Sequence, residues 1–133
     1  MTELVLDASV VLKWFRGEGE QNLGPARDLR SRFEDGEIHV LAPPLIWLEI
    51  LNVAARSWRW ESGKLEKLAA RLPDLGFELV DPELESVAHW SAAGLTAYDA
   101  AYVTVAEGAG VDLVTDDSQI VSVAPEIAVA LAS

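Results

Sequence analysis

Five acidic residues stand where a fold could bring their carboxylates together. They are Asp7, Glu49, Asp99, Asp116 and Asp117. Carboxylates a few ångströms apart in a low dielectric cannot all stay ionised unless a cation compensates their charge. An all-oxygen ligand set selects Mg²⁺ or Mn²⁺, and neither His39 nor His89 belongs to a motif that would complete a zinc site. One or two such ions suit the hydrolysis of a phosphodiester bond.

Most of these acids, taken singly, also have an ordinary structural explanation. Asp7 and Asp117 could cap helices, because a carboxylate there accepts hydrogen bonds from unpaired backbone N–H groups. Thr96 and Asp99 have the spacing of a capping box. A shared site is favoured because the acids recur at one edge of the sheet that the chain predicts.

Glu49 is the one charge in the apolar run 45–51. With Asn52 and Arg56 it forms a polar stripe at offsets of three and seven residues, the spacing of one face of a helix. A solvent-facing stripe is the ordinary interpretation. The position of Glu49 inside an apolar run is instead a reason to count it with the other acids.

Apolar runs and helix signals alternate along the chain. We expect strands at 3–7, 38–41, 77–80 and 112–115, with an edge strand at 127–131. Helices are expected at 9–16, 25–34, 45–59, 62–72, 83–93, 97–107 and 118–123, and a polar loop at 17–24. This alternation predicts a three-layer αβα fold, with a central parallel sheet of four to five strands and helices on both faces. Ligands bind such sheets beyond the carboxyl ends of the strands.

The length and composition fit one domain covering residues 1–133. Of these residues, 50% are hydrophobic and 24% are charged, so the chain can bury a core that offsets the entropy of folding. No apolar run approaches the roughly 20 residues of a membrane helix, and Met1-Thr2-Glu3 lacks the basic start of a signal peptide. The absence of Cys excludes a disulfide scaffold and thiol catalysis. We expect a cytoplasmic protein.

The charge is distributed unevenly. The formal net charge is −12, yet residues 1–71 contain 10 Lys and Arg against 11 acids, whereas residues 72–133 contain 11 acids and no Lys or Arg. Such a chain repels nucleic acid unless cations intervene or contact is confined to the N-terminal half. Lys13 and Arg16 are the candidates for that contact, because their expected helix begins beside Asp7.

The chain resembles PIN-domain ribonucleases of the VapC toxin type over nearly its whole length. Four segments carry the likeness in order, including a Glu-x-x-Asn motif, a Tyr-Asp-Ala helix start and a final Thr-x-Asp. They lie at 4–9, 44–52, 96–102 and 114–117. The resemblance implies a metal-binding acidic site of Asp7, Glu49, Asp99 and Asp117, supported by Ser9, Asn52 and Thr115. Asp116 occupies the variable place of Thr-x-Asp, and a one-residue shift would exchange it with Asp117.

The resemblance also implies a function. It predicts an endoribonuclease toxin that uses Mg²⁺ or Mn²⁺ to activate water against RNA, leaving a 5′-phosphate and a 3′-hydroxyl. It further implies a cognate VapB-type antitoxin and a toxin homodimer. Trp58 and Trp60, two apart on the expected helix, cannot share one face, so one of them is a candidate for an interface. The alternative is a catalytically silent PIN-like module that holds a basic partner on its acidic face.

Overall fold

The sheet has five parallel strands, as the sequence predicts. The computed structural model describes residues 1–16 and 21–132. The strands are β1 (Thr2–Leu6), β2 (Ile38–Ala42), β3 (Glu78–Leu79), β4 (Asp112–Thr115) and β5 (Ala128–Ala130). Their order is β3-β2-β1-β4-β5, and every neighbouring pair is parallel.

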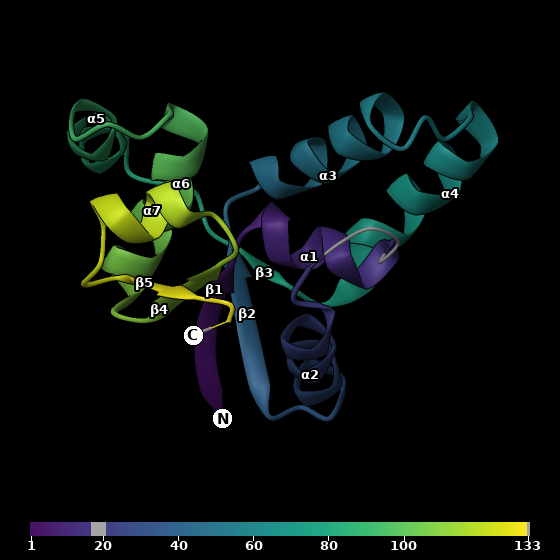
Figure 1. The fold of residues 1–133 in the computed structure, drawn as a ribbon, viewed down its shortest axis with the longest axis horizontal. Coiled ribbons are helices and arrows are strands. Elements are labelled where there is room, and N and C mark those ends of the chain that lie inside the picture. Colours follow the sequence, from purple (N-terminus) through teal and green to yellow (C-terminus); the bar gives the residue numbers. More distant parts are fainter. Residues whose placement is uncertain (17–20, 133) are drawn as a thin grey trace.

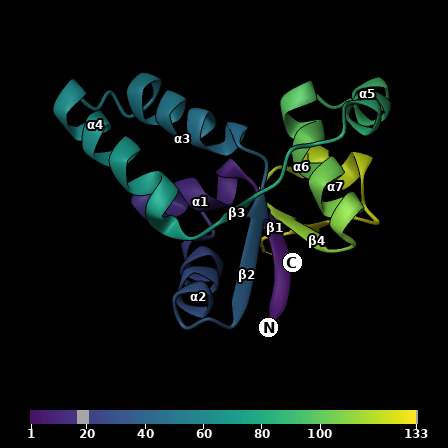
Figure 2. The same cartoon turned by 180° about the vertical axis from the view of Figure 1, so that it is seen from behind.

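Helices cover both faces of this sheet. They are α1 (Ala8–Phe15), α2 (Leu23–Glu34), α3 (Leu45–Arg56), α4 (Ser62–Arg71), the 3₁₀ turn η1 (Leu72–Leu75), α5 (Leu84–Ala92), α6 (Ala97–Ala109) and α7 (Ser118–Val123). Figures 1 and 2 show α1 to α4 on one side of the strands and α5 to α7 on the other. No helix among the described residues is both long and apolar enough to span a bilayer.

The order of the strands creates a crevice beside β1. The chain leaves β1 for β2 on one side, and it later returns to β4 on the other side of β1. The connections after β1 and β4 therefore diverge to opposite faces of the sheet, which is where open α/β sheets bind ligands. Asp7 directly follows β1, and Asp116 and Asp117 directly follow β4.

Most predicted elements are confirmed within two residues, and β4 and α7 match their predicted bounds. The strand expected at 77–80 is shorter, because β3 pairs on one side only and turns away at Asp81-Pro82. Of the loop expected at 17–24, residues 17–20 lie outside the described residues, and α2 already begins at Leu23.

The helix expected to run to residue 59 ends at Arg56, which corrects the prediction for the two tryptophans. Arg59 has a left-handed backbone conformation, with φ at 56°. The chain therefore turns between Trp58 and Trp60, and their ring centroids lie 5.1 Å apart. The expectation that the two rings occupy different faces is wrong, because it assumed a helix that does not extend that far.

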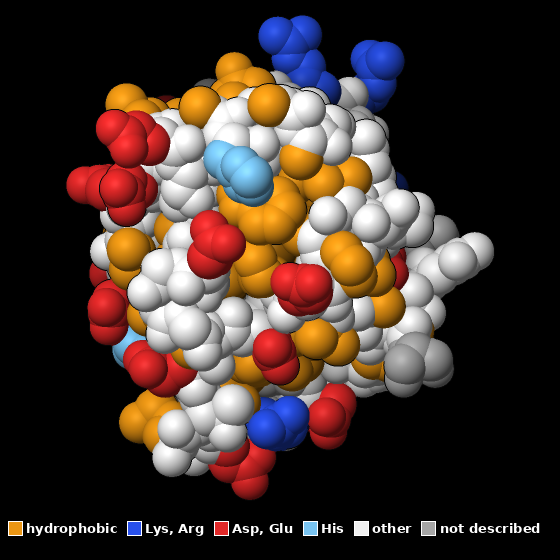
Figure 3. Space-filling model, turned by 90° about the vertical axis from the view of Figure 1, so that its left-hand side faces the viewer, with side chains coloured by type: hydrophobic (Ala, Val, Ile, Leu, Met, Phe, Trp, Pro, Cys, Tyr) orange, Lys and Arg blue, Asp and Glu red, His pale blue; other side chains and the backbone are white. Residues whose placement is uncertain are grey.

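The two sides of the sheet differ in charge. All Lys and Arg precede residue 72, so α5, α6 and α7 carry none. Figure 3 looks onto this side and shows red carboxylates around an orange apolar patch, with blue side chains only near the top and bottom of the view. The charge asymmetry of the sequence has thus become an asymmetry between two faces of one molecule.

The core lies on both sides of β1, and α3 shows how its boundary is set. Ile46, Ile50 and Ala54 recur at helical spacing and are completely buried in the core. Leu48, on the opposite face of the same helix, is 70% exposed. The buried stripe fixes the rotation of α3, and that rotation decides where Glu49 points.

Truncation of the buried stripe tests this assignment. We expect Ile50→Ala to lower the free energy of unfolding by about 2–5 kcal/mol, because it opens a cavity in a fully buried position. The matched change Leu48→Ala, on the exposed face of α3, should cost less than about 0.5 kcal/mol. Urea unfolding followed by circular dichroism measures both, and equal losses would contradict the orientation of α3.

Candidate active site

Asp7 is the buried carboxylate at the centre of the crevice. It is only 4% exposed. Its Oδ1 accepts a hydrogen bond from the Ser9 hydroxyl at 2.6 Å, and its Oδ2 accepts one from the Thr115 hydroxyl at 2.5 Å. Asp7 occupies the N-cap position of α1, yet its side chain closes no cap hydrogen bond. The predicted cap role of Asp7 is therefore replaced by a hydrogen bond between the side chains of Asp7 and Ser9.

The same two hydroxyls hold the loop after β4. The Asp116 N–H donates to Ser9 Oγ, and the Asp117 N–H donates to Thr115 Oγ1, each at 3.0 Å. Each hydroxyl thus accepts from one backbone amide and donates to one oxygen of Asp7. This double relay ties residues 115–117 to the end of β1.

Asp99 and Asp117 reach the site from helix starts, as their cap spacing predicts. The Asp99 N–H donates to Thr96 Oγ1 at 3.0 Å at the start of α6. Asp117 caps α7, where its Oδ1 accepts from the Gln119 N–H at 2.9 Å. The cap interpretation is confirmed for Asp117, and the structure shows the half of the capping box in which Thr96 accepts from the Asp99 N–H.

The electrostatics of Asp7 show what its burial costs. Burial raises the pKa of the Asp7 carboxyl to about 6, and the charge of Asp99 adds to this rise. Hydrogen bonds from Ser9 and Thr115, and the nearby Val10 N–H, act in the opposite direction. Because burial outweighs these bonds, the ionised form of Asp7 is disfavoured in the metal-free fold.

Asp99 is the carboxylate through which the others are coupled. Burial raises the pKa of Asp99, and the charge of Asp117 raises it further. Burial also raises the pKa of Glu49, again with a contribution from the charge of Asp99. Asp99 therefore lies within electrostatic reach of Asp7, Glu49 and Asp117. The structure brings these four acids into one region.

Tyr102 is a site residue that the sequence did not single out. It lies three residues after Asp99, on the buried face of α6, and is 1% exposed. Its hydroxyl donates to Glu49 Oε1 and so links α6 to α3 across the crevice. Burial and the charge of Glu49 raise the pKa of Tyr102, which keeps this hydroxyl protonated as a donor. The only sequence signal for this role of Tyr102 was its position one helical turn after Asp99.

Asn52 lies at the rim rather than at the centre. It is exposed on α3, one turn beyond Glu49. Together they line a hollow of about 250 Å³ with Leu45, Leu48 and Tyr98. Of the three predicted supporting residues, Ser9 and Thr115 contact Asp7, whereas Asn52 borders the entrance.

Asp116 belongs to a separate ion pair, with a buried lysine. Its Oδ2 lies 3.1 Å from Lys13 Nζ, and its Oδ1 accepts from Asn22 Nδ2 at 2.8 Å. Lys13 is only 5% exposed. The expectation that Lys13 offers its charge to a nucleic acid is therefore wrong, because that charge is buried against Asp116. The pair also keeps the Asp116 carboxylate neutralised beside the crevice.

The donor set suits a hard divalent cation. No three or more His, Cys, Asp and Glu side chains within residues 1–16 and 21–132 already surround a point where an ion would sit. Mg²⁺ needs only one or two carboxylates, because it keeps several waters. Four coupled carboxylates, three of them with raised pKa values, meet this need with oxygen ligands alone.

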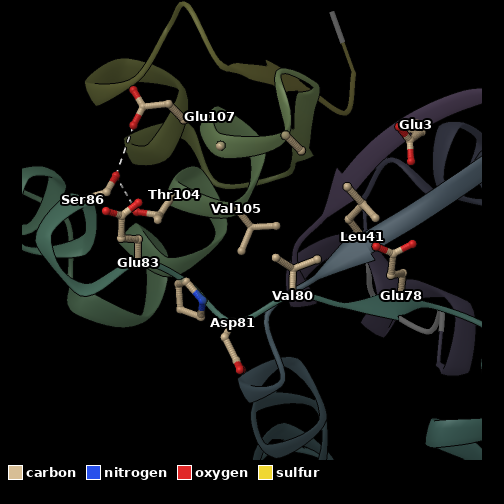
Figure 4. Close-up of a pocket in the computed structure, with 13 residues that line it drawn as sticks. Glu3, Leu41, Glu78, Val80, Asp81, Glu83, Ser86, Thr104, Val105 and Glu107 are labelled. Carbon is tan, nitrogen blue, oxygen red and sulfur yellow. Dashed lines mark hydrogen bonds between the residues drawn. The ribbon is translucent and has the colours of Figure 1, made fainter.

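Another hollow, of about 600 Å³, lies apart from these carboxylates (Figure 4). Glu78 and Val80 line it from the β3 side, and α5 and α6 line it from the other. Within it the Thr104 hydroxyl donates to Ser86, which donates to Glu107. None of the acids around Asp99 takes part in this lining, so the two places share no carboxylate.

Removing Lys13 tests its ion pair with Asp116. We expect Lys13→Met to lower the free energy of unfolding by about 3 kcal/mol, because it leaves a carboxylate without its counter-charge. The double variant Lys13→Met with Asp116→Asn should recover part of that loss, since the carboxylate that faced Lys13 is removed as well. A double-mutant cycle by urea unfolding measures the coupling. Additive losses would show that Lys13 and Asp116 do not interact.

The pH dependence of stability tests the burial of Asp7. In the folded, metal-free protein its pKa is about 6 against an ordinary value of 3.8, so the folded state holds the proton more tightly. Stability should therefore fall as pH rises from about 4 to beyond 6, by about 3 kcal/mol from Asp7. Asp7→Asn imitates the protonated form and should flatten this profile. Parallel profiles for both proteins in EDTA would contradict the assignment.

Comparisons with known proteins agree on the fold. A structure of PAE2754 from Pyrobaculum aerophilum is 23% identical, covers 98% of this chain and 91% of its own, and has a TM-score of 0.67. A toxin-antitoxin complex from Klebsiella pneumoniae is 16% identical, with 96% and 97% covered and a TM-score of 0.56. The structure of FitAB bound to an IR36 DNA fragment is 12% identical, with 96% and 94% covered and a TM-score of 0.62.

The family comparison decides the relationship. No curated protein sequence matches the chain. The family model of the PIN domain, however, matches residues 4–125, a span that contains every candidate acid and both sides of the crevice. The chain belongs to the PIN domain family.

Proposed function

We propose that this protein is an endoribonuclease toxin that depends on Mg²⁺ or Mn²⁺. The observation that carries the proposal is the coupling of Asp7, Glu49 and Asp117 through Asp99 at the crevice of a parallel sheet. Membership of the PIN domain family supports it. The chemistry that such a carboxylate group supports is hydrolysis of a phosphodiester.

In this proposal Asp7, Asp99 and Asp117 hold the ion, with Glu49 on the opposite wall. When bound, the ion supplies water activation and stabilisation of the charge that develops on the phosphate. The ligand in Thr-x-Asp is Asp117, because its charge acts on Asp99, whereas the charge of Asp116 is met by Lys13.

The remaining residues hold these acids in position. Ser9 and Thr115 fix both oxygens of Asp7, so its orientation changes little when charge arrives. Tyr102 donates to one oxygen of Glu49 and leaves the other available to orient water or substrate. Hydrogen-bonded supports of this kind typically raise the affinity of a carboxylate site for its ion.

The partners follow from the same proposal. One structural relative is described as a toxin-antitoxin complex, which supports a VapB-type antitoxin that neutralises this protein. A homodimer of the toxin is part of the same proposal. A Lys or Arg of the antitoxin would suit the acidic crevice by charge. The proposed RNA substrate places the protein in the cytoplasm.

Purified protein should cleave RNA in Mg²⁺ or Mn²⁺ and lose this activity in EDTA. Asp7→Asn or Asp99→Asn should reduce the cleavage rate by at least about a hundredfold, since each removes a charge that the ion requires. The matched control is Asp112→Asn, an exposed acid on β4 outside the crevice, which should keep the wild-type rate. Gel analysis of labelled RNA measures cleavage, and thermal melting confirms that each variant folds.

Two outcomes would contradict the proposal in different ways. Equal activity of Asp7→Asn and wild type would remove the acidic crevice from the reaction. No metal-dependent cleavage by a folded wild-type protein would favour the alternative, a binding module that holds a basic partner on its acidic face.

To separate the roles of Asp116 and Asp117, Asp117→Asn should lose cleavage, whereas the double variant Lys13→Met with Asp116→Asn should retain it.

A further inference from the structure

The junction between α3 and α4 presents two tryptophans side by side. The ring centroids of Trp58 and Trp60 lie 5.1 Å apart at an interplanar angle of 46°. Arg59 between them has φ at 56°, a conformation that L residues rarely adopt. The turn is fixed by hydrogen bonds from the Trp58 N–H to the Val53 carbonyl and from the Trp60 N–H to the Ala54 carbonyl. Both rings remain only half buried.

Cations surround this pair. Arg16 Cζ lies 5.7 Å from the centroid of a Trp58 ring, and Lys64 Nζ lies 3.9 Å from the centroid of a Trp60 ring. Arg56 and Arg59 are exposed beside them. Residues 45–71 contain five Lys and Arg against three Glu, so this segment is positive in a chain of net charge −12. We call Arg16, Trp58, Arg59, Trp60 and Lys64 the aromatic tip.

The aromatic tip is connected to the acidic crevice by two helices. α1 begins directly after Asp7 and α3 carries Glu49 near its start, and both extend away from the sheet to the same side (Figure 1). Their far ends meet where Arg16 contacts Trp58. Glu49 lies seven residues before Arg56, the last residue of α3, which corresponds to about 10 Å along the helix, and Trp58 follows two residues later. The exposed side chains of Asn52 and Arg56 lie between them on one face of α3.

These features match the chemistry of single-stranded nucleic acid. Bases stack on aromatic rings regardless of sequence, while Lys and Arg bind the phosphates between them. A cation over a tryptophan ring marks a face that attracts positive charge and that a base could cover instead. A few nucleotides would span the distance from the crevice to the tip.

We propose that the aromatic tip is a subsite for single-stranded RNA, which holds the strand a few nucleotides away from the crevice. A base stacks on Trp60, and Lys64 moves from the ring to the adjacent phosphate. Arg59, presented by its left-handed turn, binds a second phosphate. This inference rests on the proposed function for the identity of the strand, but binding at the tip needs none of the acidic residues.

Binding of a fluorescein-labelled ten-nucleotide single-stranded RNA, measured by anisotropy in EDTA, tests the subsite without cleavage. We expect Trp60→Ala to weaken binding at least about fivefold, and Trp60→Phe to retain most of the affinity because it keeps a stacking face. Lys64→Ala should reduce the slope of log affinity against log salt by about 1. Its matched control is Lys67→Ala, an exposed lysine one turn further along α4, which should change affinity by less than about twofold.

Each result decides for or against the aromatic tip. Unchanged affinity in folded Trp60→Ala, equal losses for Lys64→Ala and Lys67→Ala, or no RNA binding by wild type would each overturn it. Loss of antitoxin binding with unchanged RNA binding would show a protein contact instead and would also overturn it. Cleavage distinguishes the two proposals. RNA binding that depends on Trp60, in a protein that cleaves no RNA, would support the aromatic tip and refute the nuclease. Cleavage by a protein whose RNA binding does not depend on Trp60 would support the nuclease and refute the aromatic tip.

Discussion

The arrangement of the crevice depends on one buried carboxylate held by two hydroxyls. Ser9 and Thr115 each donate to Asp7, and each also accepts a backbone N–H from the loop after β4. The position of that loop, which carries Asp117, is thereby set by the carboxylate at the end of β1. These hydrogen bonds do not offset the effect of burial on the carboxyl group, because the pKa of Asp7 still rises to about 6. A fold selected for stability alone would gain by removing this charge.

The sheet separates two electrostatic environments as well as two layers of helices. Every Lys and Arg belongs to the part of the chain before residue 72, and α5 to α7 carry acids but no Lys or Arg, as the red side chains of Figure 3 show. A polyanion approaching this molecule is repelled from that side and meets cations only on the side of α1 to α4. Because the crevice lies between the layers, the strand of the proposed function would reach it from the side of the aromatic tip.

The sequence predicts local features well and distant pairings poorly. β4 and α7 have the predicted bounds because apolar runs and a capping acid define them locally. The burial of Lys13 escaped prediction because its partner, Asp116, is more than a hundred residues away. The contact of Tyr102 with Glu49 likewise requires α6 and α3 to meet across the sheet. The end of α3 was missed because an arginine, with neither Gly nor Pro nearby, adopts the left-handed turn.

The acids that could cap helices are also the candidate ligands of an ion, and the topology of the fold explains why. Helices that follow parallel strands begin at the carboxyl edge of the sheet, so capping acids and ligand acids are placed at the same edge. Asp117 is explained by its cap bond to Gln119 even without an ion. Asp7 is not, because its side chain closes no cap bond and its burial disfavours its own charge. Helix capping therefore does not account for the buried negative charge of Asp7, whereas the proposed ion would.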